Sequence, residues 1–306
     1  MNTRTLTLKK GEIIPLNFDY VFTSIFNNEK NISILENFLS VYLEIPVEEL
    51  KGKVKLKSRY LELESKNSKS KQIDLLLDLD GEKINIELSN NISDGIINRN
   101  IVYASNIHGR QLKYGDNTYT KIKRTIQINL SSKHINNKLK ETYYFTNSDG
   151  KILSKKLQID VIDMEIGRRI CYTNSENKLA RWCRVLTSRT EEEFIKSLGD
   201  DLMENNAKEM LIEEVNKYSS DEEAVVLYSA YTKEELEKNT LLEEAEELGL
   251  KRGMEEGLKQ GIEKGIEQGK REKQLEIAKH LLEQGVSIDI IRISTQLNDN
   301  EIEELK

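Results

Sequence analysis

Alternating apolar and polar residues predict a β-hairpin between residues 72 and 90, in the segment QIDLLLDLDGEKINIELSN. The dipeptide Asp80-Gly81 divides the two strands, and it favours the two-residue turns whose twist matches that of paired strands. In the register centred on this turn, the apolar residues of both strands share one face, and Asp74 lies directly opposite Glu87. The apolar face is formed by Ile73, Leu75, Leu77, Leu79, Ile84, Ile86 and Leu88.

Periodicity in the rest of the chain predicts helices on both sides of this hairpin. Alternation predicts strands at 51–65, 125–132, 141–152 and 157–166. Helical spacing covers 16–45, with a break near Asn27, recurs over 94–115, and is the only pattern after residue 175. The order of elements therefore predicts an α/β fold in which helices flank a mixed sheet, followed by an all-helical C-terminal region.

Glycine recurs at every fourth position from Gly249 to Gly269, in a segment rich in Glu, Lys and Gln. Each glycine costs roughly 1 kcal/mol in a helix interior relative to alanine, so a helix here needs close packing to form. Two interpretations stay open: a helix that self-associates along the glycine row, or a loosely ordered linker. The tail beyond it has the outline of a helix-turn-helix, with Gly285 ending one helix and Ser287 capping the next. Its few positive charges favour packing or oligomerisation over DNA reading.

Asp74 and Glu87 are the residues of the hairpin that indicate chemistry. Two like charges that face each other across a β-ladder destabilise it, so the pair needs a cation between the carboxylates or a shared proton. Mg²⁺ binds one or two carboxylates and keeps several waters, which leaves positions for a phosphate and an attacking water. The alternative is a solvated pair on an exposed face beside a lysine.

The composition indicates a polar protein with a proper core. The chain has 306 residues, of which 37% are hydrophobic and 32% are charged, so it is long enough to bury a core. Its net charge of −7 excludes a protein surface that is basic on all sides and binds nucleic acid by charge alone. The two cysteines and three histidines form no zinc pattern, which favours free thiols in a reducing compartment. Neither a segment of signal-peptide type nor a run of ~18 apolar residues occurs, so we expect a cytoplasmic protein without membrane contact.

The order of Asp74, a short hairpin and Glu87 resembles the PD-(D/E)XK nuclease superfamily. More narrowly, FDYVFTSIF, IDLLLDLDGEKINIEL and RNIVYASNIHGRQLKYGDNTY look like the recombination-promoting nuclease / putative transposase family, and so do the glycine repeat and the ending IAKHLLEQGVSIDIIRI. The resemblance covers residues 15–130 and the tail. It implies a restriction-endonuclease-like core and metal-dependent cleavage of DNA, with a role in DNA recombination or mobile elements.

By this resemblance, Asp74 and Glu87 bind Mg²⁺ or Mn²⁺, together with the backbone carbonyl of Leu88. The ion would activate a water and stabilise the charge that develops on the phosphate. Asp19, in a segment similar to the first helix of the family, is a further candidate ligand of the metal. The alternative is that Asp19 only caps its helix or forms a salt bridge.

Position 89 departs from the pattern of the family. The superfamily usually has Lys there and this family often Gln, whereas this chain has Ser89. A lysine holds the attacking water and adds positive charge, but a serine hydroxyl donates one hydrogen bond without charge, so we expect a weakened site. Gln72 lies opposite Ser89 in the expected register and is a candidate for positioning the water.

A basic strand precedes the hairpin. Eight positions between 51 and 71 are Lys or Arg and two are Glu, a local surplus of positive charge. Such a face can neutralise DNA phosphates, and the alternative is an edge strand that lysines protect from aggregation. Arg99, on the following helix, is a candidate to orient a carboxylate or to contact phosphate. The candidate nucleic-acid contacts are Lys53, Lys55, Lys57, Arg59 and Arg99.

Two functions remain open at this point. The first is a Mg²⁺-dependent DNA endonuclease that forms a homo-oligomer through its C-terminal helices. The second, favoured by Ser89, is a catalytically reduced relative that binds nucleic acid or a protein partner and self-assembles through the same tail. We expect a nuclease-like domain over 1–170, a helical region over 171–245, the glycine-repeat segment over 246–275 and a small helical tail over 276–306.

Overall fold

The computed structural model describes residues 8–61, 71–90, 93–112, 115–132, 137–173 and 176–305. The chain divides into two compact units, Met1–Tyr231 and Thr232–Lys306, and each is described by itself. Helix α9 (Glu222–Glu283) begins in the first unit and continues in the second. The division into four domains expected from the sequence stays a prediction.

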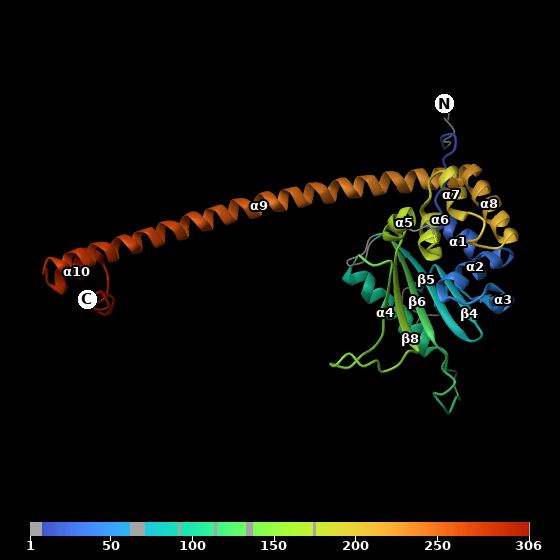
Figure 1. Cartoon of the computed structure of the whole chain (residues 1–306), viewed down its shortest axis with the longest axis horizontal. Coiled ribbons are helices and arrows are strands. Elements are labelled where there is room, and N and C mark those ends of the chain that lie inside the picture. Colours follow the sequence, from blue (N-terminus) through green and yellow to red (C-terminus); the bar gives the residue numbers. More distant parts are fainter. Residues whose placement is uncertain are drawn as a thin grey trace. The chain divides into compact units, whose positions relative to one another are not determined.

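A mixed sheet forms the centre of the first unit (Figure 1). Within the described residues it has six strands in the order β1-β4-β5-β6-β8-β7, and β2 pairs with β3 in a separate two-stranded sheet. The pairs β5-β6 and β6-β8 are parallel and the other pairs are antiparallel. The strands are β1 (Val54–Leu56), β2 (Tyr60–Leu61), β3 (Lys71–Gln72), β4 (Leu75–Leu79), β5 (Glu82–Ser89), β6 (Thr125–Ser131), β7 (Lys140–Tyr143) and β8 (Leu157–Asp163).

Helices cover both faces of this sheet, which confirms the α/β fold expected from the sequence. One face packs on a large apolar core that includes Phe22 and Leu35 from the first helices and Trp182 and Leu211 from the later ones. Helix α4 lies over the other face (Figure 1). The helices are α1 (Asp19–Phe26), α2 (Ile32–Leu43), α3 (Val47–Leu50), α4 (Asp94–Gly109), α5 (Met164–Thr173), α6 (Lys178–Thr187), α7 (Glu191–Leu198) and α8 (Asn205–Ser220), with a short 3₁₀ helix, Glu29–Asn31, between α1 and α2.

The turn between β4 and β5 sets the register of the hairpin. Asp80 and Gly81 both have positive φ, 50° and 91°, as a type I′ turn requires. Leu75 pairs with Ile86, and the pairing continues to the turn, so the register predicted from the sequence is confirmed.

Two expectations about the neighbouring strands are wrong. Ile73 does not share the apolar face of Leu75, because the chain bends at Asp74 and Ile73 packs instead against Ile107 of α4. The segment 51–65 is not one strand either: β1 ends at Leu56 and the chain is irregular until β2. Residues 62–70, the remainder of the basic segment up to β3, lie outside the described part of the chain.

A row of buried polar side chains runs along β6 under α4. Ile126, Ile128 and Leu130 belong to the large apolar core, whereas the alternate residues of the strand point to the other face of the sheet. Helix α4 meets these polar residues directly, since His108 Nδ1 lies 2.9 Å from the hydroxyl of Thr125. The polar row consists of Thr125, Gln127, Asn129 and Ser131, and all four are fully buried.

The second unit consists of helices joined by short turns in its described residues. It contains the greater part of α9 and the short helices α10 (Ile288–Thr295) and α11 (Asp299–Glu303), which pack around Ala278, Ile291 and Ile302. Gly285, with φ of 75°, follows the end of α9, and Ser287 precedes α10 without a side-chain hydrogen bond to the helix.

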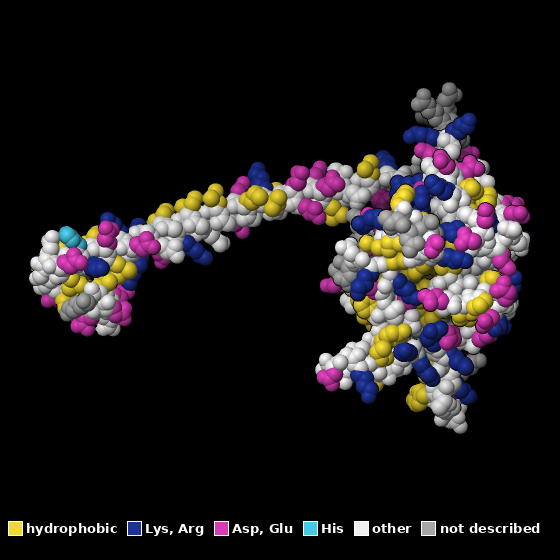
Figure 2. All heavy atoms as spheres, in the orientation of Figure 1, with side chains coloured by type: hydrophobic (Ala, Val, Ile, Leu, Met, Phe, Trp, Pro, Cys, Tyr) yellow, Lys and Arg dark blue, Asp and Glu magenta, His cyan; other side chains and the backbone are white. Residues whose placement is uncertain are grey.

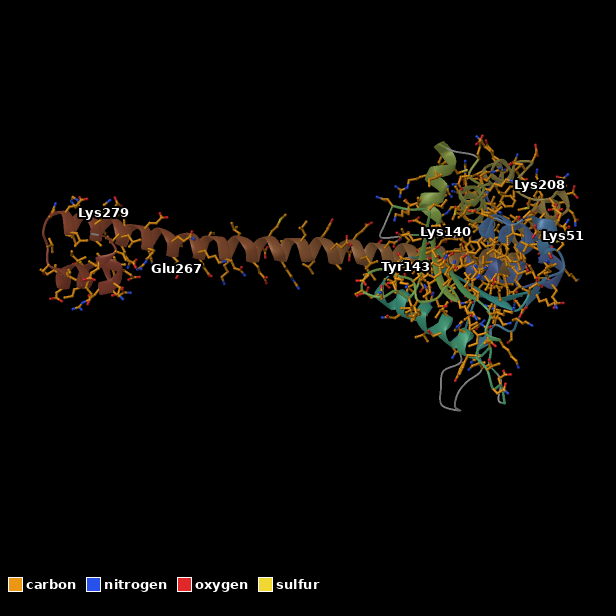
Figure 3. All side chains as sticks on the ribbon, turned by 60° about the horizontal axis from the view of Figure 1, so that its bottom comes forward. Lys51, Lys140, Tyr143, Lys208, Glu267 and Lys279 are labelled. Carbon is orange, nitrogen blue, oxygen red and sulfur yellow. The ribbon has the colours of Figure 1, made fainter. Side chains whose placement is uncertain are left out.

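The glycine repeat lies inside α9 and is helical. Apart from the chain neighbours and the backbone of the helix itself, no described atom lies within 4 Å of the position that a Cβ would take at any of its six glycines. An apolar residue follows each of the first five glycines, and Figure 2 shows hydrophobic side chains in a row along this helix. These residues, each more than half exposed, are Leu250, Met254, Leu258, Ile262 and Ile266. Side chains around Glu267 project outward from the helix (Figure 3).

The described helices include none with the length and apolar character needed to span a lipid bilayer.

Candidate active site

Asp74 and Glu87 meet across the hairpin next to the bend that precedes β4. The backbone N–H of Leu88 donates to Oδ2 of Asp74 at 2.8 Å. The backbone N–H of Asp74 in turn donates to Oε1 of Glu87 at 3.2 Å. Each carboxylate is therefore held by the backbone of the opposite strand, and the two acids lie together as the register predicts.

Burial raises the pKa of both carboxyl groups. Glu87 is 2% exposed, and burial together with the charge of Asp74 raises its pKa to about 8. The pKa of Asp74 is also raised, first by burial, while the hydrogen bond from Leu88 opposes the shift and the charge of Asp19 adds to it. Two ionised carboxylates at this place are unfavourable without a cation, because desolvation and mutual repulsion act in the same direction.

Arg99 of α4 is the cation nearest to Glu87 among the described residues. Its Nη2 lies 3.9 Å from Oε2 of Glu87, which is an ion pair but no hydrogen bond. The guanidinium Nε and Nη2 are buried and have no hydrogen-bond partner among the described residues. Arg99 therefore compensates part of the negative charge of the two acids, but it donates no hydrogen bond to either carboxylate.

The carboxylate oxygens of Asp74 and Glu87 are suitable ligands for a hard divalent cation. Asp74 and Glu87 each have one oxygen bound by the opposite strand, and their other oxygens, Oδ1 and Oε2, accept no hydrogen bond within the described residues. Mg²⁺ takes one or two carboxylates and fills its remaining positions with water, so two acids suffice. The described chain contains no group of three His, Cys, Asp or Glu side chains that could hold a metal.

A family model described as a PD-(D/E)XK nuclease family transposase matches residues 16–245. The chain belongs to this family. The match covers nearly all of the first unit, and it confirms the resemblance found in the sequence. No curated protein and no solved structure shows significant similarity to the chain.

Ser89 and Gln72 are not paired with each other. The ladder between β4 and β5 ends at Leu75 and Ile86, and Gln72 is exposed and pairs with Tyr60 in the two-stranded sheet. The expected pairing of Gln72 with Ser89 is wrong, because the bend at Asp74 takes the chain away from β5. The role of Gln72 in positioning water stays a prediction that no contact supports.

The other two expected metal contacts lie beside the acids in different ways. Asp19 is the exposed first residue of α1, and its charge raises the pKa of Asp74, so the two carboxylates lie within electrostatic reach. Leu88 contacts Asp74 through its N–H. The expected role of its carbonyl oxygen as a ligand stays a prediction.

Two of the four basic candidates before the hairpin have a partner among the described residues. Lys53 forms an ion pair with Asp80 at 3.7 Å, and the Nε of Arg59 donates to the carbonyl of Ile73 at 2.9 Å. Lys55 and Lys57 are exposed. The charge of Arg59 lowers the pKa of Asp74, so Arg59 lies near the acids, whereas contact of these four residues with phosphate stays a prediction.

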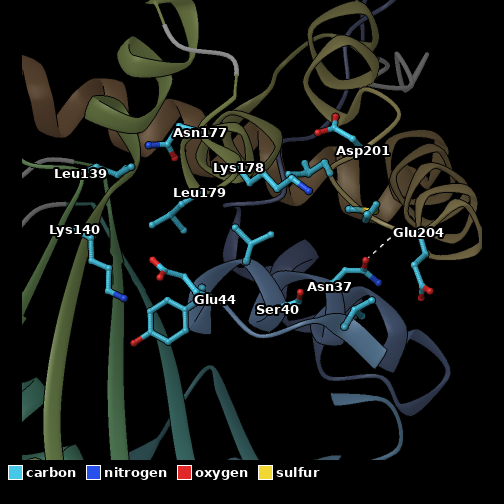
Figure 4. A pocket seen from close by; sticks show the side chains of 15 residues that line it. Asn37, Ser40, Glu44, Leu139, Lys140, Asn177, Lys178, Leu179, Asp201 and Glu204 are labelled. Carbon is cyan, nitrogen blue, oxygen red and sulfur yellow. Dashed lines mark hydrogen bonds between the residues drawn. The ribbon is translucent and has the colours of Figure 1, made fainter. Parts of the chain in front are cut away.

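A cavity of about 710 Å³ lies elsewhere in the first unit (Figure 4). Its lining includes Asn37 and Glu44 near α2, Lys140 of β7 and Lys178 at the start of α6. The ammonium group of Lys140 lies 3.5 Å from Oδ2 of Asp160 and 4.2 Å from the centre of the Tyr42 ring. Neither Asp74 nor Glu87 lines this cavity, so it is not the space in which a substrate would meet the two acids.

Sequence reasoning missed the polar residues that surround Glu87. Asn85 donates through Nδ2 to Oε1 of Glu87 at 3.2 Å and to Oε1 of Gln127 at 2.7 Å. Ser89 donates to Oδ1 of Asn129 at 2.7 Å. The signal was the alternation of Gln127 and Asn129 with isoleucine and leucine in TIQINLSS, which marks a second face of the strand with polar chemistry.

Proposed function

We propose that this protein is a metal-dependent DNA endonuclease that hydrolyses phosphodiester bonds, with a role in DNA recombination or in mobile elements. The observation that supports this most directly is the meeting of Asp74 and Glu87, two acids on adjacent segments of the hairpin to which no cation of the described residues donates a hydrogen bond. Family membership favours the same function, since it indicates a nuclease of the transposase type.

The residues of the site have distinct tasks in this proposal. Asp74 and Glu87 would hold Mg²⁺ or Mn²⁺ through the oxygens that the opposite strand leaves free. When bound, such an ion lowers the pKa of a coordinated water and stabilises the charge on the phosphate. Arg99 orients Glu87 from α4, and Asn85 holds the inner oxygen of the same carboxylate. Burial under α4 limits the access of bulk water to this group.

Supercoiled plasmid DNA tests the proposal directly. We expect the purified protein to nick or cut the plasmid in the presence of Mg²⁺ or Mn²⁺, and we expect an excess of EDTA to abolish the products. Heat-inactivated protein in the same buffer is the control for contaminating metal-catalysed breakage. A protein that binds the plasmid but leaves it intact with every divalent ion contradicts the proposal.

That last outcome would support a second candidate function, a catalytically reduced relative that binds nucleic acid or a protein partner. The specific observation behind it is Ser89, a neutral residue at the position where the superfamily usually has lysine. Its hydroxyl is already bound to Asn129, so it supplies neither charge nor a free donor to a substrate.

We also propose that the chain forms a homo-oligomer through α9 and that it works in the cytoplasm, where its free cysteines stay reduced. The glycines of α9 leave the helix backbone accessible, and the apolar residues beside them are more than half exposed. A second helix can approach closely along such a face and cover these side chains.

Light scattering of the full-length chain tests the oligomer. We expect the double variant Leu258→Asp, Ile262→Asp to be monomeric, because two buried charges would oppose the contact. The matched control is Gln260→Asp, Gln268→Asp, which adds the same charge at positions away from the apolar row and should keep the mass of the wild type. A monomeric wild type at micromolar concentration would rule out the oligomer.

A further inference from the structure

Ser89, at the end of β5, is bonded to the neighbouring strand. Its hydroxyl donates to Oδ1 of Asn129 on β6 at 2.7 Å. A serine hydroxyl has a single proton, so in this arrangement it has no second hydrogen bond to donate. The donor expected at position 89 is therefore used inside the protein, and a water in the active site needs another one.

Asn129 lies next to Glu87 in the parallel ladder between β5 and β6. Side chains of residues paired in this way point to the same face of the sheet, on strands about 4.8 Å apart. Both residues therefore lie under α4, and Asn129 is 0% exposed.

The amide nitrogen of Asn129 is buried and has no hydrogen-bond partner among the described residues. Leaving such a donor unpaired costs about 1–3 kcal/mol, so a water or a ligand atom is expected to receive its protons. In this arrangement the hydroxyl of Ser89 occupies Oδ1 of the amide, so Nδ2 keeps both of its protons for another partner.

We propose that Asn129 supplies the hydrogen-bond donor that position 89 lacks. Its amide nitrogen donates to the water that attacks the phosphate, and Ser89 is a positioning residue that holds the amide in this orientation. The inference rests on the proposed metal-dependent cleavage. A neutral amide can orient the water as a lysine does, but it adds no positive charge to the transition state.

Cleavage kinetics give the first test. We expect Asn129→Ala to lower kcat by roughly 10-fold to 100-fold, since one oriented donor is lost, while the KM for DNA stays unchanged. Ser89→Ala should lower kcat by less, because the amide remains and only its orientation is released. A merely structural role of Asn129 would instead lower the thermal stability of the protein and raise the KM together with the fall in kcat.

Metal binding gives a second test that needs no cleavage. Asn129→Asp keeps the size of the side chain and places a third carboxylate beside Glu87, so we expect Mn²⁺ to bind at least about tenfold more tightly in a calorimetric titration. The matched control is Gln127→Glu, which adds the same charge on the same strand and face, two paired positions further from Glu87. It should change the affinity by less than about threefold, as expected for a more distant charge.

Equal Mn²⁺ affinities of Asn129→Asp and Gln127→Glu, or full cleavage by Asn129→Ala, would overturn the inference while leaving the proposed function intact. A wild-type protein that binds Mn²⁺ and cuts no DNA would overturn the proposed function. In that case, if Asn129→Asp binds Mn²⁺ more tightly and Gln127→Glu does not, the result would still support a location of the Asn129 side chain next to the metal ion.

Discussion

Replacing Glu87 by glutamine is expected to lower DNA cleavage by at least about 10³-fold and to abolish the binding of Mn²⁺. Glutamine keeps the size of the side chain and an oxygen that can accept the hydrogen bonds from Asp74 and Asn85. It removes the negative charge that a divalent ion requires, so the loss falls on the chemistry and not on the fold. Single-turnover cleavage and calorimetric titration of Mn²⁺ measure the two effects.

Asp80→Asn is the matched control for this variant. Asp80 belongs to the same hairpin, but it is exposed and lies in the turn, where its positive φ is one that asparagine also adopts readily. The control removes one carboxylate and should cleave DNA at the wild-type rate. Cleavage by Glu87→Gln within about tenfold of the wild type would contradict a metal site built on this acid.

The stability of the metal-free protein is expected to fall as the pH rises from about 5 to about 8. The pKa of Glu87 is raised from its ordinary value of 4.5 to about 8 by burial and by the charge of Asp74. Between these values the folded chain keeps a proton that the unfolded chain has released, so each rise in pH favours unfolding. Glu87→Gln carries no such charge, and it should be more stable than the wild type by about 2–4 kcal/mol above pH 8.

Chemical denaturation at a series of pH values checks this result. The two proteins should have similar free energies of unfolding near pH 4, where Glu87 is protonated in both the folded and the unfolded state. A divalent ion should narrow the difference: at ten times its Kd it stabilises the wild type by about 1.4 kcal/mol and leaves Glu87→Gln unchanged. Asp80→Asn should follow the wild-type profile, and a pH-independent difference between wild type and Glu87→Gln would contradict the raised pKa.

The register of the hairpin could be predicted because local residues determine it. Asp80 and Gly81 tolerate the positive φ values of a two-residue turn, and the apolar residues on each side allow one alignment of the strands. The meeting of Asp74 and Glu87 follows from that alignment alone. A site formed by two neighbouring strands of one hairpin is thus accessible from sequence.

The environment of the site depends on contacts that are distant in the sequence. Alternation in β4 and β5 indicates one buried face, and it cannot show that α4 buries the other. For this reason the side of Ile73 was wrong, and the alternative of a solvated pair on an exposed face does not hold for Glu87, which is 2% exposed. The hydrogen bond between Ser89 and Asn129 joins residues 40 positions apart in the sequence. It depends on β6 lying beside β5, which the local sequence of neither strand predicts.

The prediction of a single strand over residues 51–65 was wrong for a different reason. Alternating lysines fit an edge strand, but β1 ends after three residues, and Arg59 turns back to the carbonyl of Ile73. Alternation indicates which residues can share a face of a strand, but the length of the strand depends on how many of its residues pair with a neighbouring strand.

The spacing of glycines in α9 limits how another helix can follow it. An α-helix turns every 3.6 residues, so a row spaced by four residues advances by about 40° around the axis at each step. From Gly249 to Gly269 the row travels about 200°, which is more than halfway around the cylinder. A straight helix packed beside α9 would therefore contact the glycine row over only a few turns. A helix that remains on it has to wind in the right-handed sense, opposite to the twist of a leucine zipper.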